Sequence, residues 1–249
     1  MPEKQKALMP EYQKAKKASK NSLGNCEFLS FAAKEAFKRL RKNVEIELSD
    51  MDGKCRTIGI TSARPSEGKS TVSVNLAYFL AEHNAKVLLI DADLRRSSIH
   101  EKLSISNTSG LSTLLLTEPN ISSVIRRYEG SNTAVSFDVI PSGETVSNPS
   151  ELLDSRRMQS IMAYLSNLYD YIILDLPPVG AVIDAVSVAQ FIDGIIVVMK
   201  ENNCSRSEFS DCIYQLERAS VRILGFVVNG AMEGSGKSYK YNYNYKYGY

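Results

Sequence analysis

The chain has 249 residues, of which 43% are hydrophobic and 23% are charged, and its formal net charge is +2. This length can bury a sizeable core, and the weak net charge argues against a nucleic-acid partner. The longest apolar runs fall far short of the roughly 20 residues of a membrane-spanning helix, and we expect no signal peptide. Four cysteines without CxxC spacing predict neither a zinc site nor a disulfide framework, in keeping with a reducing cytoplasm.

The N-terminal region changes from a basic, weakly apolar sequence to a helical pattern. Residues 1–20 carry six lysines against two glutamates. We expect residues 1–32 to form a flexible basic arm, which would either contact an anionic membrane surface or stay solvated. Residues 33–45 then show apolar side chains at helical spacing, and the polar segment 43–56 is expected to connect this helix to the first core strand.

Residues 57–71, TIGITSARPSEGKST, combine a buried-strand pattern, a loop with proline and glycine, and a helix start. In such a loop Gly68 lets backbone amides approach a phosphate, Lys69 reaches the β- and γ-phosphates, and the Ser70 hydroxyl ligates Mg²⁺. The helix N-terminus adds the positive end of its dipole. Because Ala63 stands where GxxxxGK[ST] has its first glycine, the alternative is a chance GKST in a surface loop. The predicted nucleotide-binding set is Glu67, Gly68, Lys69, Ser70 and Thr71.

Two further apolar runs end in aspartates. VLLIDADLRR (87–96) leads into Asp91 and Asp93, and YIILDLPPV (171–179) leads into Asp175. The continuous apolar runs are typical of parallel strands covered on both faces, whose carboxyl ends share the ligand-binding edge of a sheet. Mg²⁺ prefers oxygen ligands and keeps several waters, so Ser70 could bind it directly while Asp93 and Asp175 hold its waters. Asp91 could instead orient a nucleophile or accept its proton. The predicted metal set is Ser70, Asp93 and Asp175, and the predicted catalytic set is Lys69, Asp91, Asp93 and Asp175.

Strand and helix patterns alternate through the rest of the chain. This alternation predicts an α/β fold of the P-loop NTPase type, with a mostly parallel sheet and helices on both faces. The other expected strands are 137–143, 194–199 and 223–229, and the other expected helices are 72–83, 121–128, 148–153, 158–168, 181–191 and 205–219.

The C-terminal segment 233–249 has no aliphatic residue, and tyrosine occupies every second position of its final part. A terminal strand with nothing aliphatic to bury gains little from packing, so we expect a disordered tail, the alternative being an edge strand that packs one tyrosine face. Six alternating tyrosines suit a role as substrates. These residues are Tyr239, Tyr241, Tyr243, Tyr245, Tyr247 and Tyr249.

The motifs together resemble those of the bacterial tyrosine kinases (BY-kinases) of capsule and exopolysaccharide synthesis, in the separate cytoplasmic form of Gram-positive bacteria. ARPSEGKST is similar to the P-loop (Walker A) of that family, LLIDADLR to its second acidic motif (Walker A′) and YIILDLPP to its Walker B motif. The resemblance covers residues 33–249 and implies a kinase domain at 33–232 with a MinD/ParA-like fold.

The same resemblance implies what the residues do. ATP and Mg²⁺ would bind at Lys69, Ser70 and Thr71, with Asp91 and Asp93 serving the metal and tyrosine activation and Asp175 holding the metal. The tail tyrosines would be sites of autophosphorylation. Partners would be a membrane-spanning activator of the chain-length-determinant type, a cognate tyrosine phosphatase and further copies in a ring of unphosphorylated chains, at the inner face of the membrane.

Two positions depart from the family pattern. Ser66 replaces a glycine of PGEGKS, and the oligomerisation motif ExxRxxR maps onto Glu35, Lys38 and Arg41, where the central lysine lacks the planar fork of arginine. The main alternative function is a MinD/ParA-type ATPase that switches its oligomeric state, although such proteins place lysine where this chain has Arg64. A third hypothesis is a scaffold that binds nucleotide without turnover and displays its tyrosines to another kinase.

Overall fold

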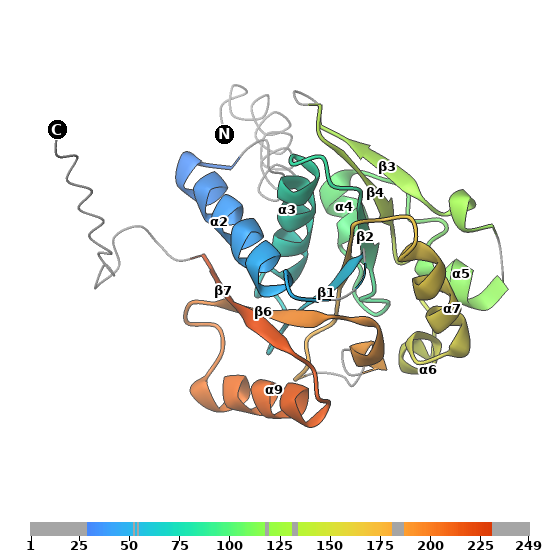
Figure 1. Cartoon of the computed structure of the whole chain (residues 1–249). Coiled ribbons are helices and arrows are strands. Elements are labelled where there is room, and N and C mark those ends of the chain that lie inside the picture. Colours follow the sequence, from blue (N-terminus) through green and yellow to red (C-terminus); the bar gives the residue numbers. More distant parts are fainter. Residues whose placement is uncertain are drawn as a thin grey trace, which may run out of the picture.

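A seven-stranded sheet forms the centre of the molecule, in a computed structural model that describes residues 29–51, 53, 55–117, 120–130, 134–180 and 187–230. The strand order is β3-β4-β2-β5-β1-β6-β7, and every neighbouring pair is parallel except β3 with β4. Helices cover both faces of this sheet (Figure 1). The predicted α/β fold with a mostly parallel sheet is therefore confirmed.

The elements follow one another in a largely alternating order along the chain. The strands are β1 (Arg56–Ser62), β2 (Val87–Asp91), β3 (Arg126–Glu129), β4 (Ser136–Ile140), β5 (Tyr171–Asp175), β6 (Gly194–Lys200) and β7 (Ile223–Asn229). The helices are α2 (Phe31–Glu47), α3 (Lys69–Ala81), α4 (Ile99–Leu103), α5 (Leu111–Thr117), α6 (Pro149–Leu153), α7 (Arg156–Leu165) and α9 (Arg206–Arg218), with short 3-10 turns at η2 (Ile121–Ser123) and η3 (Ala189–Phe191).

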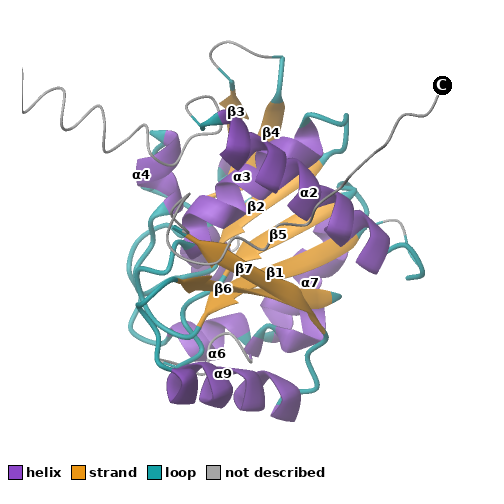
Figure 2. Cartoon of the chain, turned by 90° about the vertical axis from the view of Figure 1, so that its left-hand side faces the viewer, coloured by secondary structure: helices purple, strands orange, loops and turns teal. Residues whose placement is uncertain are grey.

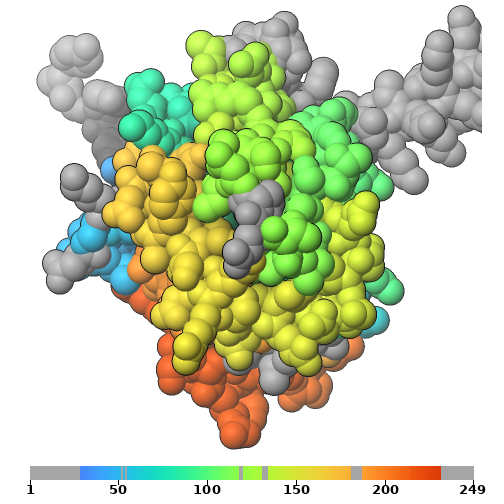
Figure 3. Space-filling model, turned by 90° about the vertical axis from the view of Figure 1, so that its right-hand side faces the viewer, coloured from blue at the N-terminus to red at the C-terminus, as the bar shows by residue number. Residues whose placement is uncertain are grey.

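Successive side chains of each central strand enter opposite halves of the core. In β2, Leu88 and Ile90 pack with α5, α6, α7 and α9, whereas Val87 and Leu89 pack with α2, α3 and α4. The two helix layers lie on opposite sides of the sheet in Figure 2, and the α6 and α7 region (yellow) covers much of the face in Figure 3. Because both faces are buried, the strand needs an unbroken apolar run, which explains the missing alternation in its sequence.

Helix α2 is held against the domain by an aromatic contact. It begins after Ser30, whose hydroxyl accepts the amide of Ala33 at 3.2 Å. The ring of Phe37 stacks on Phe79 of α3, with centroids 5.9 Å apart. Phe79 is 2% exposed and also contacts Tyr78, so one buried ring connects α2, α3 and the sheet face that α3 covers.

The prediction of a helix at 121–128 is wrong. This segment contains the single 3-10 turn η2 and then strand β3, which pairs antiparallel with β4. Tyr128 lies opposite Phe137 in the register, and their rings are 4.7 Å apart. This buried pair forms between two strands that follow each other in the chain, and the spacing of residues within 121–128 alone does not show such a cross-strand contact.

Several expectations fall on residues outside the described ranges. This group contains residues 1–28 of the arm expected at 1–32, the whole tail expected at 233–249, and residues 181–186 of the helix expected at 181–191. In the described remainder of that last segment the chain forms the 3-10 turn η3. Within the described ranges, no helix has the length and apolar character needed to cross a membrane.

We expect Phe79→Ala to lower the free energy of unfolding by about 3–5 kcal/mol, because it leaves a cavity in the core that connects α2 to the sheet. The matched control is Phe31→Ala, since Phe31 is 81% exposed and its truncation should change stability by no more than about 0.5 kcal/mol. Urea denaturation of both variants measures the difference. Similar losses for the two phenylalanines would contradict this account of the core.

Candidate phosphate-binding and catalytic site

The strand register brings two aspartates side by side. Asp91 ends β2 and Asp175 ends β5, and the parallel pairing makes them direct neighbours. Asp175 is also in register with Ile60 of β1, two residues before the end of the strand that leads into the phosphate loop. Both carboxylates are fully buried. The sheet therefore places the expected acidic strand ends at the same edge as the phosphate loop, as the sequence predicts.

The phosphate loop takes a left-handed backbone at two positions. Gly68 has φ +96, a backbone that strains other residues, and a Cβ at this position would also displace the side-chain amide of Asn229, which would lie 1.9 Å away. Asn229 ends β7 and donates a hydrogen bond to the Glu67 carbonyl at 3.0 Å. Ser66 has φ 67, a conformation that costs a non-glycine residue roughly 1–2 kcal/mol. The glycine of the related loop pattern would remove this cost.

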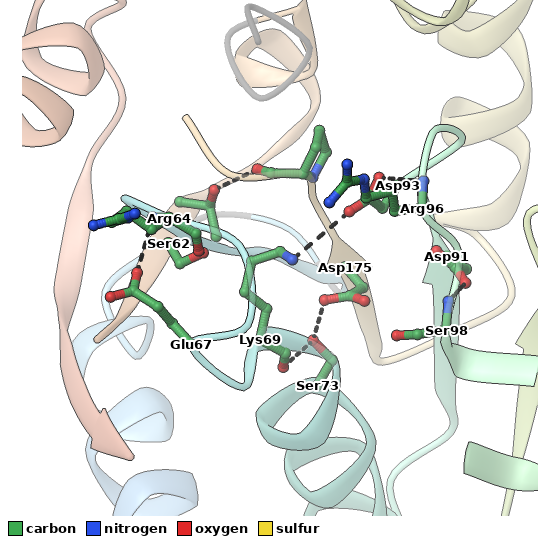
Figure 4. A network of polar contacts seen from close by, with 12 residues as sticks. Ser62, Arg64, Glu67, Lys69, Ser73, Asp91, Asp93, Arg96, Ser98 and Asp175 are labelled. Carbon is green, nitrogen blue, oxygen red and sulfur yellow. Dashed lines mark hydrogen bonds and ion pairs between the residues drawn. The ribbon is translucent and has the colours of Figure 1, made fainter. Parts of the chain in front are cut away.

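Glu67 and Arg64 lie away from the carboxylates. The buried Glu67 carboxylate accepts the backbone amide of Arg64 at 3.0 Å, so this side chain closes the loop on itself and does not line the cleft. The Arg64 guanidinium lies 3.4 Å from the carboxylate of Glu208 and donates to the Asn203 carbonyl at 3.3 Å. Arg64, which stands where MinD/ParA-type proteins have a lysine, thus pairs outside the phosphate site. Figure 4 shows both side chains on the far side of the loop.

Lys69 lies between two of the predicted aspartates (Figure 4). Its Nζ atom is 3.7 Å from Oδ2 of Asp93, and both side chains are nearly buried, at 9% and 5% exposure. The hydroxyl of Ser73 lies 2.9 Å from Oδ1 of Asp175 and 3.0 Å from the Lys69 carbonyl. Ser73 was not predicted, although its position one helical turn after Lys69 places it on the same side of α3.

Burial raises the pKa of Asp91 well above its ordinary range, and the neighbouring charge of Asp175 raises it further. The backbone amides of Ser98 and Ile99, each 3.2 Å from Oδ2 of Asp91, lower it only in part. Burial also raises the pKa of Asp175, against the opposing effect of Lys69 and of hydroxyl hydrogen bonds. Burial thus disfavours the charged form of both carboxyl groups, and a cation beside them would favour it again.

A divalent cation would fit the two buried carboxylates of Asp91 and Asp175. Oδ1 of Asp91 and Oδ2 of Asp175 are buried without a hydrogen-bond partner in the described structure. Among the described residues, no three His, Cys, Asp or Glu side chains are grouped to hold a metal by themselves. Mg²⁺ does not need such a group, because it keeps several waters and takes phosphate oxygens beside one or two carboxylates. The predicted metal set, Ser70 with Asp93 and Asp175, is consistent with that donor chemistry.

A cleft of about 600 Å³ opens over the loop and is large enough for a nucleotide. The predicted residues Gly68, Lys69, Ser70, Thr71 and Asp93 line it, whereas the fully buried Asp91 and Asp175 lie behind this wall. The sequence did not single out the basic part of the lining. Those residues are Arg95, Arg96 and Lys102.

The predicted oligomerisation residues lie apart from the cleft, on α2. Lys38 and Glu35 form an exposed ion pair of 2.8 Å. Arg41 is more buried and pairs with Glu45 of the same helix. Glu35 and Lys38 are therefore available at the surface, and the assignment of all three to an interface between copies stays a prediction.

Comparisons with known proteins agree with this geometry. Residues 55–222 match the family model described as AAA domain. The tyrosine-protein kinase YwqD of Bacillus subtilis (strain 168) is 36% identical over 196 residues, which are 79% of this chain and 80% of that protein. The tyrosine-protein kinase etk of Escherichia coli (strain K12) is 36% identical over 208 residues, or 84% of this chain and 28% of that longer protein.

Solved structures extend the likeness to three dimensions. The kinase domain of Escherichia coli tyrosine kinase ETK is 35% identical with a TM-score of 0.75, covering 85% of this chain and 80% of that one. The chimerical protein CapA2B2 is 31% identical with a TM-score of 0.71, covering 78% and 83%. The septum site-determining protein MinD from Pyrococcus horikoshii OT3, complexed with Mg-ADP, is 25% identical with a TM-score of 0.59, covering 72% of each chain.

The fold and its phosphate loop define a P-loop nucleotide-binding domain. Within this class, the relatives that match most of the chain at 35–36% identity are tyrosine-protein kinases. The chain therefore belongs to the bacterial tyrosine-protein kinase family.

We expect Asp91→Asn to raise the free energy of unfolding at pH 7 in metal-free buffer by about 1 kcal/mol or more, since the amide removes a buried charge. At pH values between the unfolded and the folded pKa of Asp91, the folded wild type binds a proton that the unfolded chain lacks, because folding raises this pKa. Wild-type stability should therefore rise as pH falls through that pKa, and the advantage of the variant should shrink toward pH 4. Thermal denaturation across pH measures both effects, and a less stable variant at pH 7 would contradict them.

Proposed function

We propose that this chain is an ATP-dependent protein-tyrosine kinase that phosphorylates tyrosines of its own C-terminal segment and thereby regulates capsule or exopolysaccharide synthesis and export. The observation that carries the proposal is the GKST loop with Lys69 beside Asp93, next to the paired strand ends Asp91 and Asp175. This constellation suits phosphoryl transfer, in which the protein mainly positions the nucleotide and neutralises charge. The kinase relatives and the repeated tyrosines support tyrosine as the acceptor.

The residues divide the chemistry between them. ATP supplies the γ-phosphoryl group, and Mg²⁺ would neutralise its charge at the oxygens of Ser70, Asp93 and Asp175. Lys69 holds a fixed cation at the β- and γ-phosphates. As the tyrosine oxygen bonds to the γ-phosphorus and the bond to ADP breaks, the phenolic proton must leave. Asp91 suits the role of proton acceptor, because its pKa is raised toward the operating pH, where a general base is most effective.

The proposal also concerns the organisation and partners of the chain. We propose a basic arm at 1–32, a kinase domain at 33–232 and a tyrosine-rich tail at 233–249. A membrane-spanning activator would hold the kinase at the inner face of the cell membrane, and a cognate phosphatase would reverse its modification. Unphosphorylated copies would assemble in a ring through Glu35, Lys38 and Arg41, of which the first two are exposed on α2.

We expect Lys69→Met to lower autophosphorylation by about 100-fold or more, because the γ-phosphoryl group loses a nearly buried cation. The matched control is Lys86→Met, since this exposed lysine precedes β2 at the end opposite to Asp91. The assay incubates purified protein with Mg·ATP, follows phosphotyrosine on a blot and measures phosphate release in parallel. Near-normal phosphotyrosine in the Lys69 variant would reject this loop as the catalytic phosphate site. Steady phosphate release without phosphotyrosine would favour the ATPase alternative.

We expect phosphorylation to pass between copies and then to separate them. Mixing a Lys69→Met chain with an active chain truncated after Met232 leaves the six tail tyrosines only on the inactive partner, so phosphotyrosine on that chain reports transfer in trans. Each phosphate adds roughly −1.5 to −2 charges, and six on one tail approach −10 by order of magnitude. Such tails should repel one another. Light scattering of phosphorylated and phosphatase-treated protein should therefore show a lower mass for the phosphorylated form, and equal masses would contradict the dissociation.

A further inference from the structure

A second lysine reaches the phosphate loop from outside it. Lys102 belongs to the short helix α4, and its Nζ atom donates a hydrogen bond to Oγ1 of Thr71 at 3.0 Å. Thr71 lies in the first turn of α3, directly after Ser70. Lys102 and Thr71 both line the cleft described above, so the ammonium group faces the space that the nucleotide would occupy.

The described surroundings of this ammonium group give it no direct ion-pair partner. Lys102 is half-buried, and burial lowers its pKa, as does the charge of Lys69, while the charges of Asp175 and Glu101 raise it. Among the described residues, its one hydrogen-bond partner is the neutral hydroxyl of Thr71, and no carboxylate oxygen lies within ion-pair distance of its Nζ. A half-buried cation with a neutral partner gains most from an anion that enters the cleft.

Lys69 and Lys102 approach the loop at different points. Lys69 extends toward Asp93, on the side where the β- and γ-phosphates and their metal are expected. Lys102 lies instead at the hydroxyl of Thr71, within the first helical turn. The backbone amides of a phosphate loop and the turn after it hold the α- and β-phosphates. The position of Lys102 therefore corresponds to the α-phosphate end of the triphosphate and not to its γ-phosphate end.

We propose that Lys102 binds the α-phosphate of the nucleotide beside Thr71, as a second lysine of the phosphate site. This inference rests on the proposed nucleotide binding and adds to it a residue on a separate element, 31 positions from its partner. An α-phosphate is present in ATP and ADP alike. Lys102 should thus strengthen the binding of both by the same factor, whereas Lys69 should favour the triphosphate.

A cation on the α-phosphate stabilises the bound nucleotide and the transition state for transfer to the same extent, because the α-phosphate keeps its charge while the γ-phosphoryl group moves. Such uniform binding lowers KM without raising kcat. The structure therefore distinguishes Lys102, which affects nucleotide affinity, from Lys69, which affects the transfer step as well.

The test measures binding of Mg·ATP and Mg·ADP by calorimetry to the full-length wild type and to Lys102→Met, Lys102→Arg and Lys86→Met. A charge-assisted hydrogen bond of this kind corresponds to about tenfold or more in affinity. Lys102→Met should lose that factor equally for ATP and ADP, Lys102→Arg should recover most of it, and Lys86→Met should match the wild type. Autophosphorylation by Lys102→Met should show a raised KM for ATP with kcat within about twofold of the wild type.

Three results would overturn the inference. Unchanged affinity of Lys102→Met for both nucleotides removes Lys102 from the site, and loss for ATP alone places its charge at the γ-phosphate. Loss of kcat at unchanged affinity assigns it to the transfer step. Thermal denaturation checks the fold of each variant, and Lys102→Gln takes the place of Lys102→Met should the latter fail to fold. A wild type that binds neither nucleotide would refute the proposed function itself, whereas normal wild-type binding with an unaffected variant refutes only the role of Lys102.

Discussion

The burial of two neighbouring carboxylates is the constraint on which the site depends. Asp91 and Asp175 are direct partners across β2 and β5, both fully buried, and each has one oxygen without a partner in the described structure. Buried charges of like sign are costly unless cations compensate them. Lys69 supplies one such cation from the adjacent loop, and a divalent metal would supply another. Keeping both carboxylates at this edge therefore costs stability, and a divalent metal bound with the nucleotide would reduce that cost.

The local motifs could be predicted because each is encoded within one segment. The GKST loop and the two apolar runs ending in Asp91 and Asp175 carry their strand, turn and helix signals in consecutive residues. Parallel strands need only a common direction for their carboxyl ends to meet. Strand β3 was missed because its buried residue, Tyr128, is stabilised by Phe137 on another strand. The pairing of two segments is not visible in the local spacing of either.

The same distinction holds within the site. Lys69 and Ser70 lie inside a motif, whereas Lys102 and Asn229 contact the loop from 31 and 162 residues away. Their residue types are common on protein surfaces, and no spacing relates them to the phosphate loop. Glu67 illustrates the converse, since a residue inside the motif turns its side chain into the loop and away from the cleft. Sequence position identifies a motif, but the fold decides which of its side chains face a ligand.

Asn229 connects the phosphate loop to the end of the last strand. It is the last residue of β7, and its amide donates to the Glu67 carbonyl next to Gly68, where a Cβ would displace that amide. The chain continues through Gly230, whose left-handed backbone (φ 73) turns it away from the strand direction. Because this side chain belongs to the last residue of β7 and contacts the loop, a shift of the loop would act directly on the end of that strand. A single polar contact at one edge of the sheet thus joins the phosphate loop to the end of the last strand.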